Sequence, residues 1–146
     1  MATVAPYHID INPWLGWNSM TFGGSNVRPN RTTSLGMAYM GFRANSVTGC
    51  YVTWDVPMAA GTWTITYIGL KDNNAGIITP SLDGVDLSTL DMYSGSNVEN
   101  FVNQWTGISV ATTGIKTLKL RTDSKNASSG NYNIDTIWIT LTRTGA

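Results

Sequence analysis

Charged residues are scarce in this sequence. Lys, Arg, Asp and Glu together make up 12% of the 146 residues, and nine basic residues balance nine acidic ones. Contacts with nucleic-acid phosphates require clustered Lys and Arg, so the composition argues against a nucleic-acid partner. Low charge also leaves little electrostatic repulsion between copies of the chain. We therefore expect a homo-oligomer, or a protein that docks on a larger particle.

Cysteine and long apolar runs are scarce as well. The single cysteine, Cys50, has no partner for a disulfide within the chain, and the apolar run over residues 50–54 predicts a buried thiol. No segment approaches the ~20 apolar residues that cross a bilayer, and the N-terminus lacks the charged start and apolar core of a secretion signal. The sequence therefore predicts no membrane partner and a soluble product made inside the cell.

Residues that carry chemistry are also few. The only histidine is His8, and Asp10 lies two positions later, where a strand would put both side chains on one face. No third or fourth metal ligand accompanies them, so we expect no metal site and no catalytic histidine. Nucleotide-binding and hydrolase motifs such as GxxxxGK[ST], HExxH and GxSxG are absent. The sequence therefore predicts no enzyme and no cofactor.

Two alternatives remain open for the acidic residues. Residues 71–74 (KDNN) and 83–86 (DGVD) offer oxygen ligands of the kind that Ca²⁺ prefers, although neither has EF-hand spacing. A pair of acids that meet only in the folded chain, as in a glycosidase, is the other alternative. A plain turn is the simpler interpretation, because Asp is favoured in turns, where it bonds to nearby backbone.

From residue 35 onward, short segments rich in β-branched and aromatic residues alternate with turn residues, at a spacing of roughly ten residues. This pattern is typical of a β-sandwich or a β-barrel. No long helix can be placed, because no segment sustains apolar residues at a helical period. The predicted strands are residues 35–42, 50–56, 62–70, 76–82, 85–90, 101–110, 115–121 and 133–142.

Two of these segments show a two-residue period most clearly. In segment 62–70, apolar residues at positions 63, 65 and 67 alternate with threonines, which predicts one apolar face and one hydroxyl face. In segment 133–142, apolar residues at positions 137, 139 and 141 share a face, so Trp138 should point away from the core. Between two other strands, Asp83-Gly84 predicts a hairpin, because both central positions of a type I′ turn favour positive φ.

Residues 1–34 differ from the rest. They contain three prolines and no sustained period, so we expect an extended N-terminal arm in front of one sandwich domain at residues 35–146. The arm also carries large apolar side chains, so it should lie against its own sandwich or against a neighbouring subunit. The candidate residues for subunit or capsid contact are Trp14, Leu15, Trp17 and Phe22.

Aromatic residues are abundant, with six Trp and six Tyr. Such rings commonly fill cores and subunit contacts, and that is the simpler interpretation here. In sugar-binding sites the same rings pack on the apolar faces of pyranoses, while nearby polar side chains bind the hydroxyls. Under this alternative, the candidate glycan contacts are Trp105 and Trp138.

Several short motifs resemble those of a known module. They are AGTWTITY at residues 60–67, LDGV at 82–85, GIKTLKL at 114–120 and KNASS at 125–129. Over residues 50–142 the sequence is similar to a jelly-roll module of phage and prophage virion proteins, which itself resembles carbohydrate-binding jelly rolls. The resemblance implies an all-β jelly-roll β-sandwich of about eight antiparallel strands. Its motifs are structural, so it implies little about activity.

For a chain that begins at Met1 with a short arm and no fibre shaft, the resemblance implies a small capsid cement or decoration protein. Such a protein would form trimers on the head surface, contact other virion proteins and be located in the virion after synthesis in the host cytoplasm. The alternative is a glycan-binding adhesin or tail-fibre tip domain that recognises host surface polysaccharide. A glycan-active enzyme is the weaker third interpretation, because no catalytic constellation is found.

Overall fold

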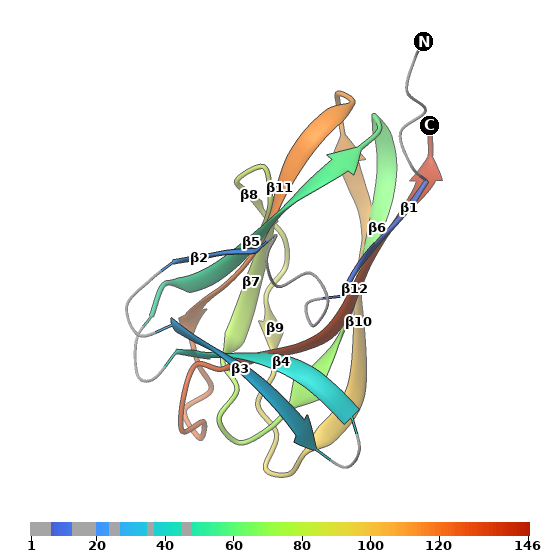
Figure 1. The fold of residues 1–146 in the computed structure, drawn as a ribbon. Helices are drawn as coiled ribbons and strands as arrows, with labels where there is room; N and C mark the ends of the chain where they lie inside the picture. The colour runs from blue at the N-terminus through green and yellow to red at the C-terminus, as the bar shows by residue number, and fades with distance from the viewer. Residues whose placement is uncertain (1–6, 13–19, 24–26, 35–36, 45–47) are drawn as a thin grey trace.

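The chain folds into two β-sheets that face each other (Figure 1). The computed structural model describes residues 7–12, 20–23, 27–34, 37–44 and 48–146, and in these ranges every regular element is a strand. Each sheet has six strands, and neighbouring strands pair antiparallel. No helix in these ranges is long and apolar enough to cross a membrane. The all-β jelly-roll sandwich that the sequence predicted is confirmed.

Sheet A is built around the C-terminal strand. Its strands are β1 (His8–Ile11), β3 (Val27–Ser34), β4 (Met37–Ala44), β6 (Gly61–Lys71), β10 (Val98–Val110) and β12 (Ile134–Gly145). They follow the order β10-β6-β12-β4-β3, and β1 also pairs with β12. One edge of β12 therefore pairs along its length with two strands, β4 near its start and β1 further on.

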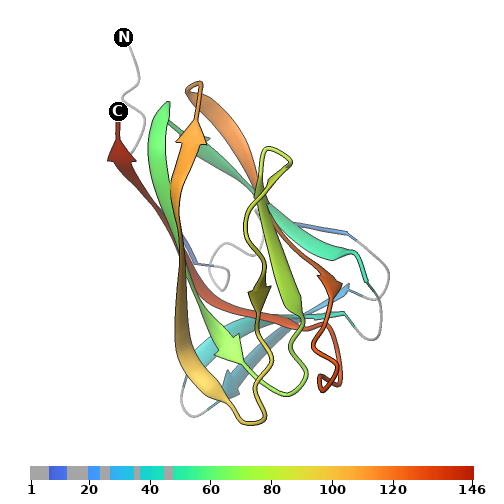
Figure 2. The same ribbon diagram turned by 180° about the vertical axis from the view of Figure 1, so that it is seen from behind.

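Sheet B forms the second layer. Its strands are β2 (Met20–Gly23), β5 (Cys50–Met58), β7 (Ile77–Leu82), β8 (Val85–Asp86), β9 (Leu90–Asp91) and β11 (Gly114–Ser124). They follow the order β2-β5-β11-β7-β8, with β9 paired to β7. The strand predicted over residues 85–90 is thus divided between β8 and β9. Figure 2 shows β10 of sheet A and β7 of sheet B running along the same side of the molecule.

The core fills the space between the sheets. In β6 the predicted alternation is confirmed, because Trp63, Ile65 and Tyr67 are at most 1% exposed while the threonines between them are half-buried. The Tyr67 hydroxyl donates to the backbone oxygen of Asp135 at 3.0 Å, which satisfies a polar group in an apolar setting. Alternate residues of β5 and β11 close the core from sheet B.

Two local predictions are also confirmed. Cys50 is buried, and burial raises the pKa of its thiol. Asp83 and Gly84 join β7 to β8 with φ angles of 48° and 80°, so both central positions of this hairpin have positive φ. A β-branched or bulky side chain would be strained at position 83.

Residues 1–34, which were expected to form an extended arm in front of the sandwich, contribute strands to it. Strands β1, β2 and β3 lie in that segment and pair with β12, β5 and β4, so both sheets use it. Short peripheral strands take their register from a partner, and such strands leave a weak periodic signal in the sequence. Pro29 fits this placement, because β3 is an edge strand, where a missing backbone donor is tolerated.

Among the four contact residues predicted in this segment, the structure describes Phe22. Its side chain is half-buried and packs against the core of its own sandwich. Trp14, Leu15 and Trp17 lie outside the described residues. Their contribution to subunit or capsid contacts stays a prediction.

The last strand departs from its predicted alternation. Ile139 and Leu141 are buried in the core as expected, but Ile137 is half-buried and Thr136 is fully buried. A register shift between Thr136 and Trp138 explains the difference, because a β-bulge offsets the alternation by one residue. The prediction was therefore wrong for Ile137, while Trp138 is partly exposed as expected.

Replacing Leu118 with Ala tests the inward face of β11. This side chain is fully buried, so its truncation leaves a cavity and should lower the free energy of unfolding by about 2–5 kcal/mol. The matched control is Ile115→Ala in the same strand, where the side chain is 65% exposed. The control should change stability by less than about 0.5 kcal/mol. Urea unfolding followed by fluorescence measures both, and equal losses would contradict the arrangement.

Candidate functional site

The outer face of sheet A carries side chains in rows that run across the strands. In one row, Val102 of β10 pairs with Ile68 of β6, and Ile68 pairs with Trp138 of β12. Val102 is 53% exposed, and the other two side chains are half-buried. We call these three residues the apolar row.

A polar row lies beside the apolar row, two positions along each strand. Gln104 of β10 pairs with Thr66 of β6, and Thr66 pairs with Thr140 of β12. Asp10 of β1 extends the row by pairing with Thr140. The Gln104 side-chain amide donates to the Thr66 hydroxyl at 3.0 Å. Because alternate residues of a strand share a face, both rows lie on the same side of the sheet.

A third row continues the polar surface. Thr64 of β6 pairs with Thr142 of β12, and Thr142 pairs with His8 of β1. Nδ1 of His8 lies 3.2 Å from the Thr142 hydroxyl oxygen. His8 and Asp10 therefore occupy one face of β1, as their spacing in the sequence predicted.

Asp10 connects these rows through its carboxylate. One oxygen, Oδ1, accepts hydrogen bonds from Trp138 Nε1 and from the Thr140 hydroxyl, both at 3.0 Å. The other, Oδ2, lies 3.1 Å from Nε2 of His8, and both side chains of this pair are about half exposed. The bond from Trp138, followed by the bond from Thr140 and the nearby His8, lowers the pKa of Asp10 below its ordinary value. The indole of Trp138 is thus held to β1 by a charged acceptor.

The structure separates the two tryptophans that were predicted as glycan contacts. Trp138 lies on the outer face, whereas Trp105 is only 6% exposed. The Trp105 and Tyr67 rings pack edge to face with centroids 6.3 Å apart, and Nε1 of Trp105 donates to the backbone oxygen of Ser88 at 2.8 Å. Trp105 is therefore a core residue in this structure, and its position does not support a contact with glycan.

The sequence alone did not single out Ile68, Val102 or Gln104 as members of the rows. Ile68 had a signal, because it continues the outward series of threonines in its strand. Val102 and Gln104 had no such signal, because the apolar residues in segment 98–110 do not alternate strictly with polar ones. Register shifts on both sides of residues 101–105 account for this irregularity.

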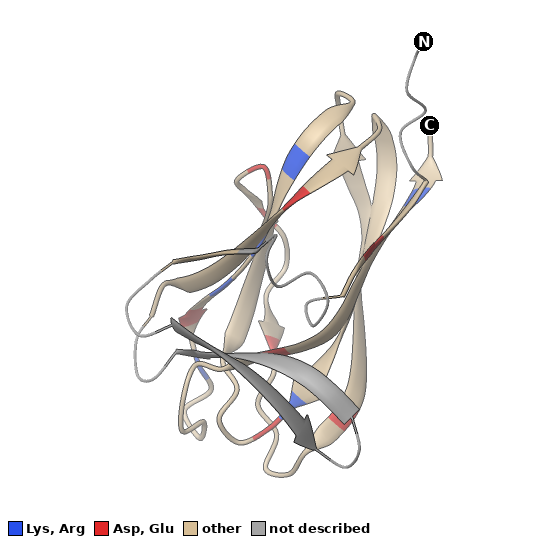
Figure 3. Ribbon diagram, in the orientation of Figure 1, with Lys and Arg blue, Asp and Glu red and all other residues tan. Residues whose placement is uncertain are grey.

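The acidic segments that were considered for Ca²⁺ serve local structure. Asp72 accepts a hydrogen bond from the backbone of Asn74 at 2.8 Å, and Asp83 accepts one from the backbone of Thr117 at 2.8 Å. Figure 3 shows charged residues spread over the described part of the ribbon. Across residues 7–12, 20–23, 27–34, 37–44 and 48–146, no group of three or more His, Cys, Asp or Glu could hold a metal ion.

No protein-family model and no curated protein sequence matches the chain. Among solved structures, it is similar to a Paenibacillus xanthan lyase, with a TM-score of 0.68 and 22% identity over 87% of this chain. The chain spans only 13% of the length of that lyase.

Two smaller structures match over most of both chains. One is the carbohydrate-binding module CBM36 in complex with calcium and xylotriose, with a TM-score of 0.62 and 17% identity over 92% of this chain and 99% of that one. The other is the module CBM6cm-2 from Cellvibrio mixtus lichenase 5A in complex with cellotriose, with a TM-score of 0.56 and 16% identity over 82% of this chain and 88% of that one.

These likenesses show that the fold is that of carbohydrate-binding-module β-sandwiches. This part of the sequence resemblance is confirmed, whereas the similarity to phage and prophage virion proteins receives no support from them. Trimers, contacts with capsid or other virion proteins, location in the virion and the lack of enzymatic activity stay predictions.

An acid titration of the Trp138 indole tests the bond to Asp10. The carboxylate form accepts this bond, and its pKa is lowered in the folded chain, so the bond should persist until the pH falls below the ordinary aspartate value of about 3.9. The Trp138 Nε1–H resonance in ¹H–¹⁵N NMR spectra should therefore shift with a midpoint below that pH. In Asp10→Asn the same resonance should stay constant over this range. A midpoint at or above the ordinary value would contradict the bond.

Proposed function

We propose that this protein is a glycan-binding module and that it binds neutral oligosaccharides on the outer face of sheet A. One observation carries the proposal: the apolar row of Val102, Ile68 and Trp138 lies directly beside a polar row that ends at Asp10. This surface is amphipathic on the scale of a few side chains. Glycan binding is the alternative function that the sequence left open besides a role on a capsid.

The pairing of the two rows suits the chemistry of a sugar. A pyranose has an apolar face of C–H groups and a rim of hydroxyls, so it needs an apolar surface and hydrogen-bonding groups side by side. Trp138 is the largest apolar side chain in the rows, and Gln104, Thr66 and Thr140 supply amide and hydroxyl groups. Oδ1 of Asp10 already accepts two hydrogen bonds, so Oδ2, which among the described residues contacts only His8, has the capacity to accept one more from a ligand hydroxyl.

The bond between Trp138 and Asp10 also prepares the ring for binding. An aromatic side chain that is free to rotate loses conformational entropy when a ligand orders it. The indole of Trp138 donates to Oδ1 of Asp10, and Thr140 donates to the same oxygen. The ring is therefore already partly ordered, and less conformational entropy is lost when a ligand binds. Strand β1 is therefore part of the proposed site.

The charges of the three rows favour a neutral ligand over an acidic one. Asp10 and His8 are their only ionisable members among the described residues, and Asp10 is anionic at neutral pH. A uronic acid would meet this carboxylate without a Lys or Arg in the rows to neutralise it. We therefore expect neutral chains such as xylan or glucan fragments to bind more tightly than polyuronates.

The length of the polar row favours an oligosaccharide over a single sugar. The row crosses four strands, and strands are ~4.8 Å apart, so its ends are separated by about 14 Å. A chain that lies across the strands contacts the row at several successive sugar units. The ligands named with two similar structures, xylotriose and cellotriose, are trisaccharides and provide suitable probes.

Calorimetric titration with xylotriose, cellotriose and trigalacturonate tests this function. At least one neutral trisaccharide should bind, and Trp138→Ala should weaken it at least tenfold, because loss of a central aromatic contact costs about 2 kcal/mol. The matched control is Tyr51→Ala, since Tyr51 is a half-buried aromatic residue on the outer face of sheet B. This control should bind as the unmodified chain does.

Three results would count against the proposed function. They are tighter binding of trigalacturonate than of both neutral probes, an unchanged affinity in Trp138→Ala, and an equal loss in the two variants. Retained thermal unfolding transitions in both variants show that any loss reflects the site and not the fold.

A further inference from the structure

A pocket lies away from the outer face of sheet A, between the edges of the two sheets. It has a volume of about 360 Å³, which is at the lower end of the range of ~300–1,000 Å³ for small-molecule pockets. We call it the edge pocket. Its lining residues are Leu82, Asp83, Val85, Leu87, Ile108, Ser109, Val110, Ala111 and Lys116.

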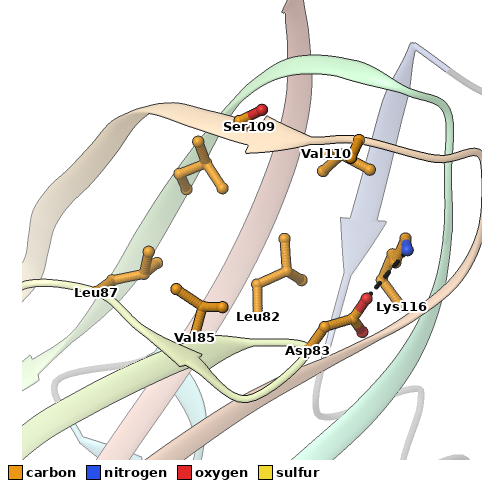
Figure 4. A pocket seen from close by; sticks show the side chains of 9 residues that line it. Leu82, Asp83, Val85, Leu87, Ser109, Val110 and Lys116 are labelled. Carbon is orange, nitrogen blue, oxygen red and sulfur yellow. Dashed lines mark ion pairs between the residues drawn. The ribbon is translucent and has the colours of Figure 1, made fainter.

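Apolar side chains from both sheets form most of the edge pocket. Leu82 of β7 and Val110 of β10 are buried in its wall, whereas Val85 of β8 is 68% exposed. Figure 4 shows Leu82, Val85 and Leu87 arranged along the β7–β8 side, with Val110 opposite them. The β7–β8 hairpin and the end of β10 therefore leave an apolar gap that the protein's own side chains do not fill.

One end of the edge pocket is polar because Lys116 points between the sheets. It occupies the same face of β11 as the buried Leu118, and its side chain is only 16% exposed. Its Nζ lies 3.0 Å from Asp83 Oδ2 and 3.4 Å from the Thr112 hydroxyl. Figure 4 shows this ion pair at the edge of the apolar lining.

Asp83 is held in place independently of Lys116. Its Oδ1 accepts a hydrogen bond from the backbone of Thr117 at 2.8 Å, and this bond is the main cause of the lowered pKa of Asp83. The ion pair of Lys116 and Asp83 therefore has no net charge, and its carboxylate is held in place by the backbone of Thr117. An ammonium group has three donors, and the two contacts above account for two of them.

We propose that the edge pocket binds a small neutral molecule with an apolar body and one hydrogen-bond acceptor, such as an ester or ketone carbonyl, which accepts from Lys116. The Lys116–Asp83 pair has no net charge, so an anion or a cation would lose its hydration on entering the apolar pocket without a net electrostatic gain, and each would also lie near a charge of its own sign. A neutral acceptor meets neither penalty. The apolar body covers surface that water now meets at Val85 and Leu87.

Binding at the edge pocket is independent of the proposed glycan site. The two sites use different residues, since the edge pocket lies between the sheets and the three rows lie on the outer face of sheet A. Failure of one proposal leaves the other unchanged, and spectral changes in separate sets of residues distinguish them.

Titration of the ¹⁵N-labelled chain with three six-carbon probes tests the proposal. The probes are hexyl acetate, which is neutral, hexanoate, which is anionic, and hexylammonium, which is cationic. Hexyl acetate should produce saturable shifts in the backbone amides of residues 85–87 and 109–111. Its affinity should be at least about tenfold higher than that of either charged probe.

A matched pair of variants tests the part played by the ammonium group. Lys116→Met keeps most of the side-chain length but removes the donors, and it should weaken hexyl acetate about tenfold. Lys119→Met lies in the same strand on the outer face of sheet B, with its Nζ 4.5 Å from the centre of the Tyr51 ring, and should leave the affinity unchanged.

Several results would overturn the proposal. Shifts that do not saturate, shifts confined to other residues, or equal affinity for hexanoate would show that the pocket does not select a neutral ligand. Concentration-dependent shifts of the same amides without a probe would show that a second copy of the chain occupies the pocket. The comparison of the three probes on the unmodified chain remains decisive even where Lys116→Met fails to fold.

Discussion

Successive side chains of a β-strand point to opposite faces, and in β6 and β12 this constraint ties the core to the outer surface. The inward residues Trp63, Ile65 and Tyr67 fill the space between the sheets, and their burial holds the register of β6. The same register places the outward residues of β6 beside those of β10 and β12. The amphipathic rows on sheet A are therefore a direct consequence of the packing behind them, and a slip of one residue would destroy both.

The sequence predicted those parts of the fold that depend on local pattern. The alternation in β6, the Asp83-Gly84 hairpin and the buried Cys50 each have a signal within a few residues, and the structure confirms them. The strands before residue 35 have no such signal, because partner strands set their register. The bulge before Trp138 is likewise set by pairing with β6, so the sequence could not reveal it.

The candidate site was predictable only in part, for the same reason. Trp138, His8 and Asp10 were each noticed in the sequence, but nothing in it indicated that residues 128 positions apart share a hydrogen bond. That contact depends on the long-range pairing of β1 with β12. Trp105 was proposed as a glycan contact only because aromatic residues are abundant. The register shifts of β10, which the sequence does not reveal, decide that its ring is buried. The similarity to carbohydrate-binding modules concerns the fold alone, so the proposed glycan site rests on the residues of the rows.

The central claim is that a glycan lies across the strands of sheet A, and mapping a bound oligosaccharide by NMR tests it most directly. With xylotriose or cellotriose added to the ¹⁵N-labelled chain, the account predicts shifts of the Trp138 indole, the Gln104 side-chain amide and the backbone amides of residues 8–10, 64–68 and 138–142. Shifts confined to the connecting loops or to the outer face of sheet B, at residues such as Tyr51 and Lys119, would contradict it.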